Sequence, residues 1–356
     1  IISKQSLEEL SAQHADVFTT VSEITAKECS HFLKRDVDFI TPNGFEDTFV
    51  PKESEFNLKR KTARNKIIKI SELLLNTKFS ENTFLIATSG RYEFRNKGID
   101  LFIDSLGKLN NNDNNDRKIL AFVLIPANHY GPRKDLLRKI NGEKSELTDS
   151  KYLTHNLHDA DWDPILKRIK DAGLMNEEND LVKIIFVPSY LNGNDGIFNM
   201  PYYDILIGFD LTVFPSYYEP WGYTPLESLA FSVPTLTTSL SGFGLWAQKE
   251  YGQKCDCMAI VERTDDNDAE VTENIVKDIY TINNLKDKDI KDIKEKAWSI
   301  SRTALWENLV TFYKQAYNSA LAKVNERVDL FVEIGQKPEE LVHDYIKPGV
   351  NEPIWK

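Results

Sequence analysis

Short unbroken apolar runs alternate along much of the chain with longer segments whose apolar residues recur at helical spacing. The runs are typical of parallel strands covered on both faces, where every side chain is buried. The alternation predicts an α/β fold in which helices flank a doubly wound parallel sheet. The predicted strands are 83–87, 119–125, 181–187, 210–214, 233–238 and 257–261, and the predicted helices are 60–76, 99–109, 164–174, 225–231, 269–282 and 289–324.

A separate pattern of helix, strand, helix and strand occupies the start of the chain. We expect helices at 7–14 and 24–33, the second capped by Ser22, and strands at 17–21 and 39–40. Pro42-Asn43-Gly44 is typical of a turn, and a length of 356 residues predicts about two domains. The expected divisions are 1–43 (the end of a first domain), 44–60 (a linker), 61–324 (a second domain) and 325–356 (a terminal helical segment).

Composition excludes several kinds of partner. The formal net charge of −11 disfavours a nucleic acid, and no apolar run approaches the length of about 20 residues that a membrane span needs. The cysteines, Cys29, Cys255 and Cys257, do not form two ligand pairs, so we expect reduced thiols in a cytoplasmic protein and no zinc site.

The turn between the strand at 210–214 and the helix at 225–231 concentrates candidate chemistry. Glu219 and Glu227 lie eight positions apart, with two prolines and Gly222 between them. Open α/β folds bind ligands where parallel strands end, and the first amides of a helix attract phosphate. We therefore expect a sugar-nucleotide site here, with one carboxylate on each side of the phosphates.

A structural role competes for Glu227. Thr224-Pro225-Leu226-Glu227 has the order of a capping box, with Thr at the N-cap, Pro at the first helical position and Glu at the third. On this interpretation Glu227 caps the helix and contacts no ligand. Glu219, taken alone, is an ordinary loop carboxylate.

A second loop, after the strand at 83–87, carries Arg91, Arg95 and Lys97. Cations in loops are usually solvated. Arginine nevertheless offers a planar fork and lysine a point charge to phosphate oxygens, so this loop is a candidate phosphate site.

The string from Phe214 to Glu227 closely resembles the signature of glycogen synthases of the glycosyltransferase family 3 type. Gly-Arg-Tyr-Glu-Phe at 90–94 and Ser-Gly-Phe-Gly at 241–244 resemble further segments of that family. The resemblance implies a two-domain GT-B enzyme with Rossmann-like domains, in which 1–43 would end the first domain. Because the chain begins at Ile1, we expect most of that first domain, with its acceptor-side residues, to precede it.

The implied reaction is transfer of glucose, with retention of configuration and without a metal or other cofactor, from a nucleotide donor to the non-reducing end of an α-1,4-glucan. UDP-glucose is the expected donor, although an adenosine donor stays open, and a homo-oligomer is possible. We expect this chain by itself to be inactive. For the phosphates of the donor, the resemblance implies contacts from Arg91 and Lys97, with Arg95 less certain, and from the amides of Gly222, Tyr223 and Thr224. It implies that Glu219 contacts the glucosyl group and that Glu227 contacts the ribose. Tyr190 and Tyr202 would contact the base.

Other interpretations remain beside this one. Tyr190 and Tyr202 are equally well explained as packed aromatic residues, and the same fold could serve a sugar-binding or scaffold protein without catalysis. A dehydrogenase is disfavoured because no Gly-x-Gly-x-x-Gly follows a predicted strand.

Two further patterns are interpreted as structural. Asp159-Ala160-Asp161 matches the Asp-x-Asp metal motif of the other large glycosyltransferase fold, but it precedes a predicted helix, so we interpret it as an acidic helix start. Lysines 288, 291, 294 and 296 alternate with carboxylates and predict a solvated helix face with local ion pairs.

Overall fold

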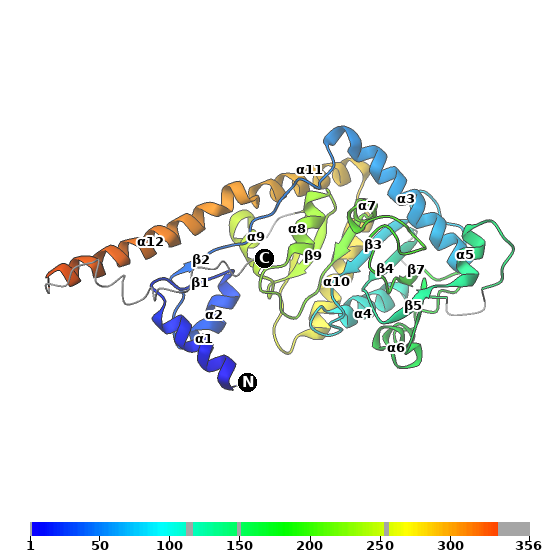
Figure 1. Ribbon diagram of the computed structural model, residues 1–356. Helices are drawn as coiled ribbons and strands as arrows, with labels where there is room; N and C mark the ends of the chain where they lie inside the picture. Colours follow the sequence, from blue (N-terminus) through cyan, green and yellow to red (C-terminus); the bar gives the residue numbers. More distant parts are fainter. Residues whose placement is uncertain (1, 112–116, 148–150, 253–255, 334–356) are drawn as a thin grey trace. The chain divides into compact units, whose positions relative to one another are not determined.

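The computed structural model describes residues 2–111, 117–147, 151–252 and 256–333 (Figure 1). The chain divides into two compact units. One comprises residues 1–42 together with 309–356, and the other comprises residues 43–308. The larger unit contains the candidate site.

A six-stranded parallel sheet forms the centre of the larger unit, in the order β10-β9-β8-β3-β4-β7. All six predicted strands are present, which confirms the predicted α/β fold with a parallel sheet. From β3 the chain proceeds through β4 and β7 to one edge, then returns to β8 and proceeds to the other edge. The strand order therefore reverses between β3 and β8, which is where open α/β sheets form their binding crevice. The strands are β3 (Phe84–Ser89), β4 (Ile119–Leu124), β7 (Val182–Phe186), β8 (Leu211–Val213), β9 (Thr235–Thr238) and β10 (Met258–Val261).

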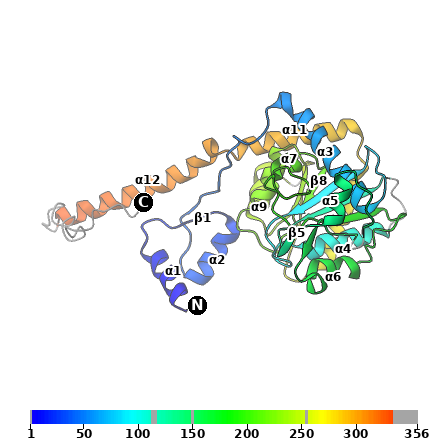
Figure 2. The same cartoon turned by 45° about the vertical axis from the view of Figure 1, so that its right-hand side comes forward.

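Helices cover both faces of the sheet (Figure 2). On one face α4 packs against α6 and α10, and on the other α3 packs against α7 while α8 packs against α11 (Figure 1). A short antiparallel pair, β5 (His129–Pro132) and β6 (His155–Leu157), lies beside this sheet with α5 (Lys134–Ile140) between them in sequence. The remaining helices of this unit are α3 (Glu53–Leu75), α4 (Ile99–Asn110), η1 (Ala160–Trp162), α6 (Pro164–Asp171), α7 (Tyr202–Leu206), α8 (Tyr223–Ala230), α9 (Gly242–Tyr251), α10 (Asp268–Asn283) and α11 (Asp287–Thr303).

Two predicted helices are corrected. The helix expected at 60–76 begins at Glu53, inside the segment expected as a linker. Its first turns are polar and show no apolar repeat, so the hydrophobic pattern does not reveal where the helix starts. The helix expected at 289–324 is two helices, α11 and α12 (Trp306–Glu333). They separate where the backbone of Phe45 intervenes: its amide donates to Ala304 O (2.9 Å), and its carbonyl accepts from Trp306 N (3.2 Å).

A buried carboxylate ties α3 to the amino end of β8. Asp210 accepts hydrogen bonds from Arg60 (2.7 Å) and Arg64 (2.8 Å) of α3, and from the amide of Leu85 (3.0 Å). Burial alone would raise the pKa of Asp210, but the guanidinium charges outweigh it, and the pKa lies below its ordinary value. Burial, and then the charge of Arg60, lowers the pKa of Lys294 on α11 to about 8. Lys294 is thus a half-buried lysine close to this cluster, although its sequence pattern predicts a solvated helix face.

The smaller unit contains α1 (Ile2–His14), β1 (Thr19–Thr20), α2 (Glu23–Leu33) and β2 (Phe39–Ile40), the predicted order of elements. The two short strands pair in parallel, and Ser22 caps α2 in a reciprocal box with Thr25, as predicted for Ser22. Within this unit, Tyr313 of α12 donates to Thr41 O (3.1 Å). The predicted helical segment 325–356 is helical to Glu333, and 334–356 lie outside the described residues. No helix among the described residues is long and apolar enough to cross a membrane.

Candidate active site

Two loops meet at the carboxyl edge of the sheet where the strand order reverses. The loop at 90–98 follows β3, and the turn at 214–222 follows β8, its neighbour in the sheet. The amide of Tyr217 donates to Asn96 O (2.8 Å). Gly98 has a φ of +63°, and a Cβ built on it would lie 1.9 Å from Pro215 O. Glycine therefore allows the cationic loop to contact the turn backbone.

This contact brings together two residues that were predicted separately. The ammonium of Lys97 donates to Glu219 Oε2 in an ion pair whose side chains are both mostly buried. The turn is supported from the loop after β9, because Glu219 N donates to Leu240 O (3.0 Å) and Gly242 N donates to Glu219 O (3.0 Å). The carboxylate is thereby held in place by backbone hydrogen bonds, with a cation beside it.

The predicted capping box is wrong. The helix α8 begins at Tyr223, and its N-cap is Gly222, which has a φ of +105° and offers no side-chain cap. Thr224 already lies in the first turn, so Glu227 is too far along the helix to act as its capping-box glutamate. The first amides of α8 belong to Tyr223 and Thr224, and amides at this position have no acceptor within a helix. Glycine at 222 thus starts the helix earlier than the sequence indicated.

Glu227 instead contacts an aromatic stack. Its Oε1 accepts a hydrogen bond from the Tyr203 hydroxyl (2.9 Å). The Tyr203 ring lies 4.4 Å from Phe49 and 5.3 Å from Phe231, centroid to centroid, and is stacked on both. Burial raises the pKa of Glu227 to about 7, and the bond from Tyr203 only partly opposes this. Burial therefore moves the ionisation of this carboxyl group into the neutral pH range.

We expect Glu227→Gln to raise the free energy of unfolding by about 3 kcal/mol at pH 8 and by less than about 1 kcal/mol at pH 5. The folded pKa, about 7, lies above the ordinary value of 4.5. Ionisation between these values therefore favours the unfolded state, and stability present below about pH 4.5 is lost as the pH rises through 7. Glutamine keeps an acceptor for Tyr203 and cannot ionise. Urea denaturation of both proteins from pH 5 to 8 measures the difference, and a difference that does not vary with pH would contradict it.

A cavity of about 630 Å³ is bordered by the start of the loop at 90–98 and by the first turn of α8. Its lining includes Arg91, Tyr190, Tyr202 and Thr224, so it gathers four predicted site residues from separate parts of the chain. Tyr202 shares a hydrogen bond with Ser89 at the end of β3 (2.8 Å between the hydroxyl oxygens), whereas Tyr190 is 74% exposed. Among the residues that the structure describes, the cavity lining does not include the other five predicted site residues, which are Lys97, Glu219, Gly222, Tyr223 and Glu227.

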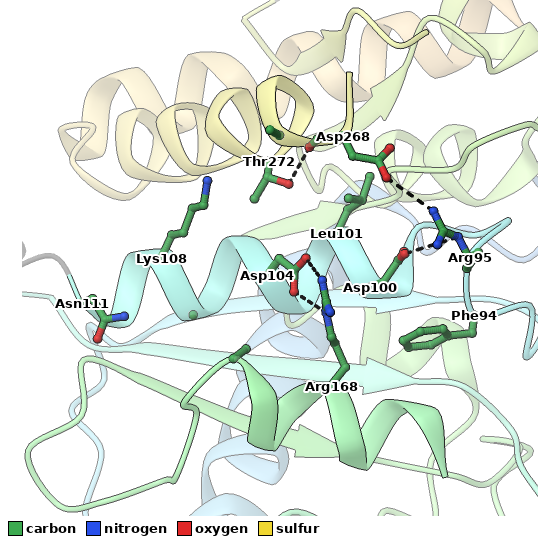
Figure 3. Close-up of a pocket in the computed structure, with 13 residues that line it drawn as sticks. Phe94, Arg95, Asp100, Leu101, Asp104, Lys108, Asn111, Arg168, Asp268 and Thr272 are labelled. Atoms are coloured by element: carbon green, nitrogen blue, oxygen red, sulfur yellow. Dashed lines mark hydrogen bonds and ion pairs between the residues drawn. The ribbon is translucent and has the colours of Figure 1, made fainter. Parts of the chain in front are cut away.

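The three cations of the loop after β3 take different directions. Lys97 contacts Glu219, and Arg91 lines the cavity while pairing with Glu93 (3.0 Å). Arg95 instead borders a second cavity of about 480 Å³ between α4, α6 and α10, where it pairs with Asp268 (3.5 Å) and Asp100 (4.0 Å) (Figure 3). Arg95 therefore lies outside the described lining of the first cavity.

Sequence reasoning missed Tyr203, which donates to Glu227, and Phe49, which stacks on Tyr203. The only signal for Tyr203 is its place beside Tyr202, and Phe49 lies in the segment that was expected as a linker. The Asp159-Ala160-Asp161 stretch leads into η1, and Asp163 then caps α6 by accepting from Leu166 N (2.9 Å). Among the described residues, no group of three or more His, Cys, Asp or Glu side chains could hold a metal ion.

The sheet, its reversal point and the two docked loops define a Rossmann-like domain of the GT-B glycosyltransferase fold. Two solved structures show this fold at 14% identity. The catalytic domain of starch synthase IV from Arabidopsis thaliana, bound to ADP and acarbose, matches with a TM-score of 0.51 over 86% of this chain and 56% of that chain. Sucrose-phosphate synthase from Thermosynechococcus elongatus matches with a TM-score of 0.50 over 91% and 63%.

The chain belongs to the glycogen synthase family, whose model matches residues 1–150 and 141–342. Glycogen [starch] synthase isoform 1 of Saccharomyces cerevisiae is 33% identical over 324 residues, which cover 71% of this chain and 46% of the relative. The human liver glycogen [starch] synthase is 34% identical over 303 residues, which cover 70% and 43%. The chain thus spans about half the length of the curated relatives it matches.

Proposed function

We propose that this chain is the donor-binding part of a retaining glucosyltransferase. The enzyme moves glucose from a nucleoside diphosphate glucose donor to an α-1,4-glucan, as in glycogen synthesis. The observation that carries the proposal is the contact between the loop of Lys97 and the turn of Glu219 at the reversal point of the sheet. Family membership supports the same reaction.

The charges of the site suit the leaving group. Cleavage of the bond between glucose and phosphate leaves negative charge on the nucleotide diphosphate. Lys97, held against Glu219, and the first amides of α8 stabilise that charge where it develops, because they are in place before the reaction begins. Arg91 adds a cation at the donor cavity. Glu219 accepts hydrogen bonds from glucosyl hydroxyls, and the step requires no metal.

The remaining predicted residues hold the nucleoside. Glu227 accepts from the ribose hydroxyls, which favours its ionised form against the effect of burial. Tyr190 and Tyr202 both line the cavity and contact the base. The proposed donor is UDP-glucose. We place the enzyme in the cytoplasm, where thiols stay reduced, and assign it no metal or other cofactor.

We expect Lys97→Ala and Arg91→Ala each to weaken UDP binding by about 1.5–3 kcal/mol, the range for hydrogen bonds to charged groups. Titration calorimetry of the 356-residue chain with UDP, and in parallel with ADP, measures the effect and identifies the base. Arg95→Ala is the matched control, because this cation of the same loop faces the other cavity. Failure of the chain to bind either nucleotide, or equal losses in all three variants, would contradict the assignment.

A further inference from the structure

Trp162 combines a fixed backbone with an exposed indole. It ends η1, where its amide donates to Asp159 O (3.1 Å), and the next residue is the cap of α6. The capping residue, Asp163, also accepts from the Tyr92 hydroxyl (2.5 Å). Despite these restraints the Trp162 residue is 87% exposed. The fold thus holds the backbone of a large aromatic residue in place without using its side chain for packing.

A recess of about 510 Å³ is bordered by Trp162 and by a second exposed aromatic residue, Tyr190. Single exposed aromatic residues are common, but two on one concave surface mark a candidate binding site. The recess shares Tyr92, Pro126 and Tyr190 with the cavity proposed for the donor. A ligand in the recess would therefore lie next to the donor.

The polar groups of the recess indicate what kind of ligand it takes. Its lining includes the side chains of Asn128 and Asp159, which make no hydrogen bond within the described part of the chain. Asp163 adds a second carboxylate, and no lysine or arginine is present among the described lining residues. Carboxylates repel phosphate but accept hydrogen bonds from hydroxyls. An uncharged molecule with an apolar face and many hydroxyls fits this surface.

We propose that this recess is a subsite for the glucan chain, in which the Trp162 indole carries the apolar face of a glucose unit. Asn128 and Asp159 bind its hydroxyls. The assignment of the glucan as ligand rests on the proposed function, since a sugar polymer is the substrate there. Its position beside the donor cavity keeps the polymer close to the transferred glucose and raises the local concentration of acceptor.

Calorimetric titration of the 356-residue chain with maltoheptaose and, separately, with UDP tests the subsite. Trp162→Ala should weaken maltoheptaose binding about five- to tenfold, the range for loss of an aromatic contact, and leave UDP affinity unchanged. Trp162→Phe, which keeps an aromatic face, should retain most of the maltoheptaose affinity. Tyr130→Ala is the matched control, because Tyr130 is 64% exposed on β5 and is absent from the described lining of the recess.

Each other outcome has a distinct meaning. No maltoheptaose binding by the unaltered chain, or equal affinity after Trp162→Ala, would overturn the subsite. A loss of UDP affinity with maltoheptaose binding intact would assign the recess to the nucleobase and also overturn it. Maltoheptaose binding that depends on Trp162 in a chain that does not bind UDP would support the subsite while contradicting the proposed donor site.

Discussion

Asp210→Asn should lower the free energy of unfolding by about 3–5 kcal/mol, the cost of removing one partner from a buried ion pair. The carboxylate lies at the edge of the sheet opposite the candidate site and is shared by Arg60 and Arg64, with Arg117 further away (3.9 Å). Asparagine has a similar shape but no charge. The guanidinium groups and Lys294 would then repel one another in a place that water reaches poorly. Urea denaturation at pH 7 measures the loss.

The control for this variant is Asp204→Asn. Asp204 also pairs with α3, through Lys59 (3.2 Å), but both of these side chains are more than a third exposed. Exposed pairs contribute about 0–1 kcal/mol, so this variant should remain close to the unaltered protein. Similar losses in the two variants would show that the buried position of Asp210 is not the cause.

Gly98→Ala should lower the free energy of unfolding by about 3–4 kcal/mol and weaken UDP binding at least about tenfold. The left-handed backbone at this residue disfavours any Cβ, and the new methyl group would overlap Pro215 O. Relief of that overlap requires the loop to move away from the turn. Lys97 would then lose its position beside Glu219. Thermal or urea denaturation gives the stability, and calorimetry gives the UDP affinity.

Gly173→Ala separates the two causes. Gly173 has a similar φ of +71°, but nothing lies within 4 Å of a Cβ built there. Its substitution should therefore cost only the backbone strain, about 1–2 kcal/mol, without affecting UDP binding. If both glycine variants lose the same stability and bind UDP normally, the contact between Gly98 and Pro215 does not position the loop.

The parallel sheet could be predicted because its signal is local. Strands such as 119–124 are apolar at every position, and a strand buried on both faces requires nothing else of the sequence. The residues of the two site loops could likewise be named from short strings. Their meeting could not, because it depends on the order of β3 and β8 in the sheet and on Gly98, whose close neighbour is 117 positions away.

The errors have the same origin. The start of α8 depends on the φ of Gly222, which no residue spacing reveals, so the sequence pattern favours Thr224 as the N-cap. Lys294 follows a sequence pattern typical of a solvent-exposed helix face. The partial burial of its side chain depends instead on α3 and β8, which lie far away in sequence. The break before α12 occurs in a stretch with no proline or glycine, and it is explained by the backbone of Phe45.

The hydrogen bonds of Phe45 have a consequence for protein engineering. Phe45 pairs with Leu305 in a parallel bridge, and Gly44 lies so close to Trp306 that a Cβ would come within 2.3 Å of its ring. Residues 43–308 therefore start and finish at adjacent points, as in domains that tolerate circular permutation or insertion into a host protein. A short flexible linker could join these two ends, and new termini could be opened in an exposed loop, giving a self-contained module for studying donor binding.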